Sequence, residues 1–367
     1  MKARAKADVA RALVGHHGLR APVAQTGVAG AQAVLERLRC IQLDPLDRIG
    51  TNADLVVAAR ADGTARGDVF RLPADVAFEH FAKERCLLPA RAFPAWRDAS
   101  AQPAWWRLSE RHAKLGPDVI ARVKAEVEAR GPLACEDLAD HGRVVPMDWS
   151  GWKGTAKAAT LAMEVLWTTC DVVTAGRQGR RRRYDLPSRA LPTWASAPGP
   201  ASFERFALLE RVEACGLLPT TLGPQWSMLR NARKSALVDG LIAEGLVQRV
   251  SIEGSTRAWL APIDFFDRRH PDDDGRMRIL GPLDPLLWDR ELVRIVFDFD
   301  YVWEVYKPAA TRTWGYYVVP LLHEGRLVGR FEGHLEAGEI VVDRRWVEAG
   351  ARFDEGAFAD ALLRQAR

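Results

Sequence analysis

The sequence has few cysteines and no long apolar run. Its five cysteines stand far apart, at Cys40, Cys86, Cys135, Cys170 and Cys215. Without a CxxC pair no zinc site is expected, and an odd, unclustered set argues against a disulfide framework and for a reducing compartment. No apolar run approaches the roughly 20 residues that span a bilayer, and the basic N-terminus lacks an apolar signal core. These absences predict a soluble, cytoplasmic protein that does not bind membranes.

Motifs of several enzyme classes are also missing. The chain contains no GxSxG nucleophile elbow, no P-loop and no carboxylate cluster that would hold the paired metals of a nuclease. The histidines are scattered and do not have metal-ligand spacing, as at His80, His112, His141, His323 and His334. We therefore expect neither a metal nor another cofactor.

The composition is that of a folded protein with unevenly placed charge. The 367 residues are 48% hydrophobic and 27% charged, which is typical of a globular chain of about two to four domains. The net charge is only +4, yet RQGRRRR at Arg177 to Arg183 holds five arginines in seven residues. The charge therefore indicates a local anion-binding segment rather than a uniformly basic surface.

Hydrophobic periodicity predicts helices at 8–19, 29–39 and 52–63, and further helices within 75–112. From residue 116 the order becomes helix, short helix, longer helix and hairpin, which is the order of a winged helix. The endings LWTTCDVVTAGRQGRRRRYDLP and LIAEGLVQRVSIEGSTRAWLAP look like two copies of one design, so we expect an internal repeat. Beyond residue 275 the chain is expected to be rich in strands, with turns at Glu324-Gly325 and Ala337-Gly338.

The stretch CIQLDPLDRIG places two polar side chains among apolar ones. If IQLD is extended, Gln42 and Asp44 share one face while Ile41 and Leu43 share the other. A carboxylate beside an amide can hold and activate a water, which suits hydrolysis through an oxocarbenium-like sugar transition state. The alternative is structural, because Asp44 followed by Pro45 also fits the N-cap and first position of a helix. On local sequence alone the cap is the favoured interpretation.

The arginine-rich hairpin is the candidate nucleic-acid contact. Arginines at a wing tip can neutralise phosphates or enter a minor groove, although a solvated loop is the alternative. The candidate DNA-binding residues are Lys153, Lys157, Arg177, Arg180, Arg181, Arg182 and Arg183. A further conspicuous pair, Asp284-Pro285, is expected to be a helix cap.

Over nearly its whole length, the sequence resembles the YcaQ/AlkZ-type winged-helix DNA glycosylases. The resemblance is carried by IQLD with Gln42 and Asp44, by ERCLLP at 84–89, by LWTTCDVV with RRRRYDLP, and by LGPLDPLLWDRELVRIVFDFDYVWEVY followed by GYYVVPLLHEGRLVGRFEGH. It implies an α+β, mainly α, fold of three tandem winged helix-turn-helix motifs followed by a small C-terminal β-barrel. The implied domains are 1–115, 116–197, 198–270 and 271–367, with the QxD strand in the first and the basic wing in the second.

The resemblance also implies an activity. It indicates a monofunctional glycosylase of the bacterial cytosol or nucleoid that excises N-alkylated purines such as N7-alkylguanine from double-stranded DNA. In the QxD branch it further implies unhooking of interstrand crosslinks, with Gln42 and Asp44 as the catalytic pair and a monomer as the default state. The sequence departs from the family pattern at Asp47, Thr51, Lys83, Glu332 and His334. The alternative from another class is a non-catalytic tandem winged-helix DNA-binding protein or transcriptional regulator.

Overall fold

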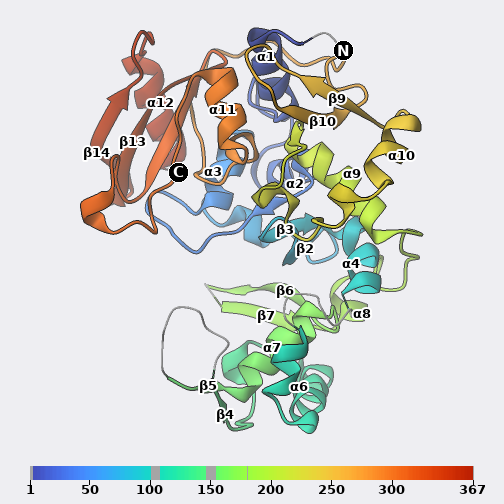
Figure 1. Cartoon of the computed structure of the whole chain (residues 1–367). Coiled ribbons are helices and arrows are strands. Elements are labelled where there is room, and N and C mark those ends of the chain that lie inside the picture. Colours follow the sequence, from blue (N-terminus) through green and yellow to red (C-terminus); the bar gives the residue numbers. More distant parts are fainter. Residues whose placement is uncertain (1–2, 101–107, 146–153, 180, 367) are drawn as a thin grey trace. The chain divides into compact units, whose positions relative to one another are not determined.

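The structure is a computed structural model that describes residues 3–100, 108–145, 154–179 and 181–366 (Figure 1). Its residues divide into two units by their contacts. The first unit comprises Met1–Val69, Ala82–Cys86 and Ala207–Arg367, and the second comprises Phe70–Phe81 and Leu87–Phe206.

The first unit begins with helices that follow the predicted periodicity. These are α1 (Lys6–His16), α2 (Gly27–Leu38) and, after the two-residue strand β1 (Ile41–Gln42), α3 (Asn52–Ala58). Helix α3 starts at a capping box, in which Thr51 and Asp54 satisfy each other's backbone N–H groups. This box fixes the start of α3 at Thr51, after the segment that contains Asp44.

Two segments of the chain repeat a helix followed by a hairpin, as the sequence predicts. In the second unit α7 (Ala158–Thr168) leads into β6 (Val173–Gln178) and β7 (Arg181–Asp185). In the first unit α10 (Leu237–Ala243) leads into β9 (Val247–Ser251) and β10 (Ala258–Pro262). In each copy, the second strand of the hairpin also pairs with a short segment from earlier in the chain. In the first unit β8 (Leu218–Pro219) pairs with β10, and in the second unit Leu133 pairs with Tyr184 of β7.

The rest of the second unit consists of further helices and short strands. Figure 1 shows α6, α7 and the β6–β7 hairpin gathered together. The elements are β2 (Ala77–Phe81), α4 (Phe93–Ala99), α5 (Leu108–Ala113), α6 (Pro117–Arg130), β4 (Arg143–Val144), β5 (Ala156–Lys157) and α8 (Pro187–Ala190). Two elements span the unit boundary, β3 (Arg85–Pro89) and α9 (Phe203–Cys215).

The further helices predicted within 75–112 are present as α4 and α5, but the strands in the first part of this range were not predicted. Residues 77–89 form the strands β2 and β3, and helices begin only with α4. All five residues of β2 are buried, so its run has no polar face that would distinguish strand from helix by periodicity. Short buried strands are ambiguous in sequence for this reason.

The C-terminal sheet has the order β11-β12-β13-β14. Its strands are β11 (Arg278–Ile279), β12 (Val318–His323), β13 (Arg326–Glu336) and β14 (Glu339–Val347). Both predicted turns are confirmed, and positive φ angles at Glu324 (47°) and Ala337 (50°) reverse the chain there. Among the described residues β11 and β14 do not pair with each other, so the sheet is open rather than a closed barrel. Helix α12 (Glu355–Gln365) contacts both of these edge strands.

The stretch RIVFDFDYVWEVYKP was predicted to be rich in strands and is not. Helix α11 (Arg290–Phe297) covers its beginning, and Asp289 caps that helix by accepting from the Leu292 N–H at 3.2 Å. Leu292, Val293, Ile295 and Val296 are buried on one face of α11. Burial of this face outweighs the weak strand preference of the β-branched residues.

Candidate functional site

Gln42 is fixed in the first unit by its backbone. Its carbonyl accepts a hydrogen bond from the Asn52 side chain at 2.8 Å, and the next residue, Leu43, donates to the Arg85 carbonyl at 2.9 Å. Asn52 is fully buried and its amide oxygen also accepts from the Leu283 N–H at 2.8 Å. The end of β1 is therefore attached to α3, to the start of β3 and to the segment before α11.

The side chain of Gln42 has a defined orientation because a lysine lies against it. Lys83 donates from Nζ to Gln42 Oε1 at 2.9 Å, and its ammonium lies 5.2 Å from the centre of the Trp288 ring. An ammonium can only donate, so Gln42 must present its oxygen to Lys83 and its NH₂ group elsewhere. Burial lowers the pKa of Lys83. Sequence reasoning noted Lys83 only as a family departure and missed this contact.

Asp44 does not cap a helix. The residues from Leu43 to Asp47 have no regular secondary structure, and the next helix, α3, is capped by Thr51. The Asp44 carboxylate accepts from the Leu46 N–H at 2.9 Å, which closes a local turn. Asp47, three residues further on, is paired with Arg66. The helix-cap interpretation that local sequence favoured is therefore wrong.

The carboxyl group of Asp44 is half-buried. Burial raises its pKa, and the hydrogen bond from Leu46 opposes that rise. The nearby phenol of Tyr317 is fully buried and donates to the Gly50 carbonyl at 3.3 Å. Burial, followed by the negative charge of Asp44, raises the pKa of Tyr317. Asp44 is thus partly buried yet retains access to water.

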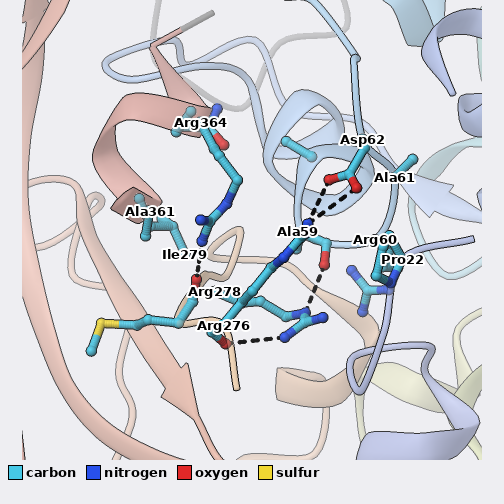
Figure 2. Close-up of a pocket in the computed structure, with 13 residues that line it drawn as sticks. Pro22, Ala59, Arg60, Ala61, Asp62, Arg276, Arg278, Ile279, Ala361 and Arg364 are labelled. Carbon is cyan, nitrogen blue, oxygen red and sulfur yellow. Dashed lines mark hydrogen bonds and ion pairs between the residues drawn. The ribbon is translucent and has the colours of Figure 1, made fainter. Parts of the chain in front are cut away.

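Two cavities in the first unit differ greatly in size. One of about 420 Å³ has Lys83, Trp288, Leu287, Arg257 and Arg290 among its walls, and this volume is in the range of small-molecule sites. The other, of about 30 Å³, is shown in Figure 2 and has room for about one water. Around the small one, Arg276, Arg278 and Arg364 bind neighbouring backbone and carboxylate oxygens. The large cavity is the one connected to Gln42, through Lys83.

The predicted basic wing is only partly available to a ligand. In the β6–β7 pair Arg177 lies opposite Arg182, and both side chains bind the buried carboxylate of Glu79, Arg182 through Nε at 2.6 Å. Arg183 donates to the Pro132 carbonyl at 2.5 Å. Arg181, on the opposite face from Arg182, is exposed. Arg177 and Arg182 thus have a structural role that the sequence did not indicate.

The two kinds of wing arginine make a testable contrast. Arg182→Ala is expected to destabilise the protein by about 1–3 kcal/mol, because it removes a charged hydrogen bond from the buried Glu79. Arg181→Ala is expected to leave stability unchanged and to weaken binding to duplex DNA, lowering the salt slope by about one. Thermal unfolding and salt-dependent anisotropy titrations measure the two effects. Equal loss of stability in both variants would contradict this assignment.

Another exposed pair of cations lies on β4 and β5 of the second unit. Arg143 and Lys157 are directly opposite each other, and both side chains are exposed. Like charges in this position repel unless an anion lies between them. Lys157 was predicted as a DNA contact, whereas Arg143 was missed because its partner follows only after fourteen residues. The predicted contacts Lys153 and Arg180 lie outside the described residues.

The described residues include neither a membrane-spanning helix nor a metal-holding cluster. None of their helices combines the length and apolar composition that crossing a bilayer demands. Within the same residues, no group of three or more His, Cys, Asp and Glu side chains is arranged to hold a metal ion.

Comparison with known proteins identifies the class. Residues 35–367 match the family model described as DNA glycosylase AlkZ-like, so the chain belongs to the AlkZ-like DNA glycosylase family. The DNA glycosylase AlkZ of Streptomyces sahachiroi has a similar structure, with a TM-score of 0.61 and 16% sequence identity over 100% of this chain and 96% of that chain. At this identity the structural likeness shows a shared fold. The family resemblance predicted from the sequence is confirmed.

Proposed function

We propose that this DNA glycosylase is monofunctional and hydrolyses the N-glycosidic bond of N-alkylated purines, chiefly N7-alkylguanine. The proposal includes unhooking of interstrand crosslinks formed on such bases. Family membership supports the glycosylase class. The observation that carries the mechanism is that Asp44 is a half-buried carboxylate that caps no helix and lies two residues after the fixed amide of Gln42.

In the proposed mechanism, Gln42 and Asp44 hold the attacking water between a donor and an acceptor. Because Lys83 occupies Gln42 Oε1, the Gln42 NH₂ group donates to the water oxygen. Asp44 accepts a water proton, and one lone pair of the water remains directed at C1′ of the sugar. The negative charge of Asp44 also stabilises the oxocarbenium-like transition state.

The chemistry of the leaving group fits a site with a single carboxylate. An N7-alkylated purine carries a positive charge, so it leaves as a neutral base without being protonated by the enzyme. Neutral bases need a general acid that this mechanism does not supply. The cavity of about 420 Å³ that contains Lys83 offers room for an enlarged base, which a tight flipping pocket would exclude.

We further propose that the chain binds duplex DNA as a monomer. The segments 1–115, 116–197 and 198–270 would act as winged helices, and 271–367 as the C-terminal domain. The helix–hairpin order of the second and third segments supports this proposal. The proposed phosphate contacts include three exposed side chains, those of Arg143, Lys157 and Arg181. Lys153 and Arg180, which lie outside the described residues, are also proposed as contacts.

Substrate choice tests the proposal. Purified protein is expected to release N7-methylguanine from duplex DNA and to leave uracil in the same sequence context untouched, because uracil leaves as an anion. Base release is measured by chromatography in the presence of EDTA. Release of uracil at a comparable rate would contradict the proposed mechanism, and release of neither base would favour a DNA-binding protein without catalysis.

The product distinguishes hydrolysis from a lyase reaction. The expected product is an intact, alkali-labile abasic site, and sodium borohydride is expected to trap no protein–DNA adduct. Lys83 is the lysine that could form such an adduct, because burial lowers its pKa and so raises the fraction of nucleophilic amine. A trapped adduct that disappears in Lys83→Met would show a Schiff base and contradict the monofunctional assignment.

A further inference from the structure

Tyr306 is an exposed aromatic residue at the point where a buried segment, residues 303–305, passes into an exposed one, residues 306–311. Its side chain is 82% exposed, whereas Tyr301, Trp303 and Tyr317 are at most 8% exposed. The Tyr306 ring meets the Trp303 ring edge to face, with centroids 5.8 Å apart. An aromatic ring left in water beside buried aromatics is available for stacking with a ligand.

The segment that carries Tyr306 is held in place by a buried carboxylate. Glu304, 2% exposed, accepts from the Trp314 N–H at 2.7 Å and from Lys307 Nζ at 2.7 Å. Burial opposes ionisation, but these bonds and those from other backbone N–H groups outweigh it and lower the pKa of Glu304 to about 2. Arg312 Nε also donates to the Lys307 carbonyl at 2.9 Å. The exposed ring therefore projects from a fixed backbone.

Tyr306 is linked through buried rings to the segment that contains Asp44. Its ring contacts Trp303, the Trp303 and Tyr317 ring centroids are 6.2 Å apart, and the Tyr317 hydroxyl donates to the carbonyl of Gly50, in the stretch between Asp44 and α3, at 3.3 Å. In agreement with this geometry, burial and then the negative charge of Asp44 raise the pKa of Tyr306. Two cations lie close by: Lys307, exposed next to Tyr306 and paired with Glu304, and Arg312, whose guanidinium lies 4.9 Å from the Tyr316 ring.

From this arrangement we propose that Tyr306 stacks on a nucleobase uncovered at the lesion, beside the nucleotide that Asp44 attacks. Bringing C1′ of a damaged nucleotide to a carboxylate requires the base stack to open, and opening leaves the face of a neighbouring base in water. An aromatic ring on a rigid backbone covers that face in a manner that tolerates any base sequence. The inference rests on the proposed function, because the location of the lesion is defined by Asp44.

The test separates stacking at a lesion from general DNA binding. Full-length protein is titrated with two duplexes, one undamaged and one containing a tetrahydrofuran abasic analogue next to 2-aminopurine. Tyr306→Ala is expected to bind the analogue duplex about 10- to 100-fold more weakly and to lose the 2-aminopurine fluorescence change, with little effect on undamaged DNA. Tyr306→Trp, which retains an aromatic ring, is expected to behave like wild type. Leu363→Ala, at another exposed apolar side chain of the same unit, is the matched control.

The outcomes are independent of base release, because the abasic analogue has no base to release. Unchanged affinity and fluorescence in Tyr306→Ala would overturn the proposal, as would an equal weakening on undamaged DNA. If wild type releases no N7-methylguanine while Tyr306→Ala still loses the fluorescence change, stacking stands and the proposed glycosylase mechanism fails. If wild type releases N7-methylguanine and Tyr306→Ala binds the analogue duplex as wild type does, the glycosylase mechanism stands and the stacking role of Tyr306 fails.

Discussion

Asp44→Asn is expected to reduce single-turnover release of N7-methylguanine by about 10²–10⁴-fold, the range that general acid–base groups contribute. Asparagine retains an oxygen that can accept from the Leu46 N–H, so the local turn at Asp44 is preserved. It loses the negative charge and the capacity to take a proton from water. DNA affinity and the unfolding temperature are therefore expected to stay at their wild-type values.

The same carboxylate predicts a pH dependence. Asp44 acts as a base only when ionised, so release slows as the pH falls through its pKa. Because burial raises the pKa of Asp44 above its ordinary value of 3.8, the loss is expected at a higher pH than for an exposed aspartate. The decrease is measured as the rate of base release against pH, corrected for spontaneous depurination. Asp44→Asn should not show this decrease at acidic pH, and a decrease that persists in the variant would assign the titration to another group.

Asp284→Ala is expected to cost about 3–5 kcal/mol of stability, the range for breaking a buried ion pair. Asp284 and Arg60 are both fully buried, and the carboxylate binds Arg60 through two bonds of 2.7 and 2.8 Å. Asp284 also accepts from the Leu286 N–H at 3.0 Å, which confirms its predicted role as a cap. Its removal leaves the buried Arg60 charge bound to the backbone carbonyls of His17 and Val56 without a counter-charge on Asp284.

A second Arg–Asp pair of the same unit provides the control for Asp284→Ala. Asp62 and Arg276, visible in Figure 2, lie 2.8 Å apart with side chains 44% and 41% exposed. Exposed pairs contribute at most about 1 kcal/mol, so Asp62→Ala is expected to shift urea unfolding only slightly. Comparable losses in the two variants would show that burial does not determine the effect at Asp284.

Most helices and the C-terminal turns could be predicted from the sequence because their signals are local. The amphipathic patterns behind α1, α2 and α6 extend over several turns, and Gly325 and Gly338 mark the hairpin turns. The secondary structure was predicted wrongly where local sequence preference and tertiary packing disagree. The β-branched residues of α11 were expected in a strand but form a helix, and the strand β2 was not predicted because all its residues are buried.

The candidate site was predictable only in part. Gln42 and Asp44 are conspicuous in the sequence, but the pair Asp44-Pro45 also looks like a helix start, and only the capping box at Thr51 shows that the helix begins later. The Lys83 contact joins residues 41 positions apart in the chain. The Arg177–Glu79 pair joins residues 98 positions apart. No local pattern indicates contacts of this kind.

The most direct measurement is single-turnover base release from duplex DNA carrying N7-methylguanine, by wild type and by Asp44→Asn, with EDTA present and both proteins saturating the DNA. Wild type is expected to leave abasic sites, and the variant is expected to bind the same duplex equally well but to leave almost none. Equal release by the two proteins, or none by either at full DNA occupancy, would contradict the assignment of Asp44 as the catalytic base.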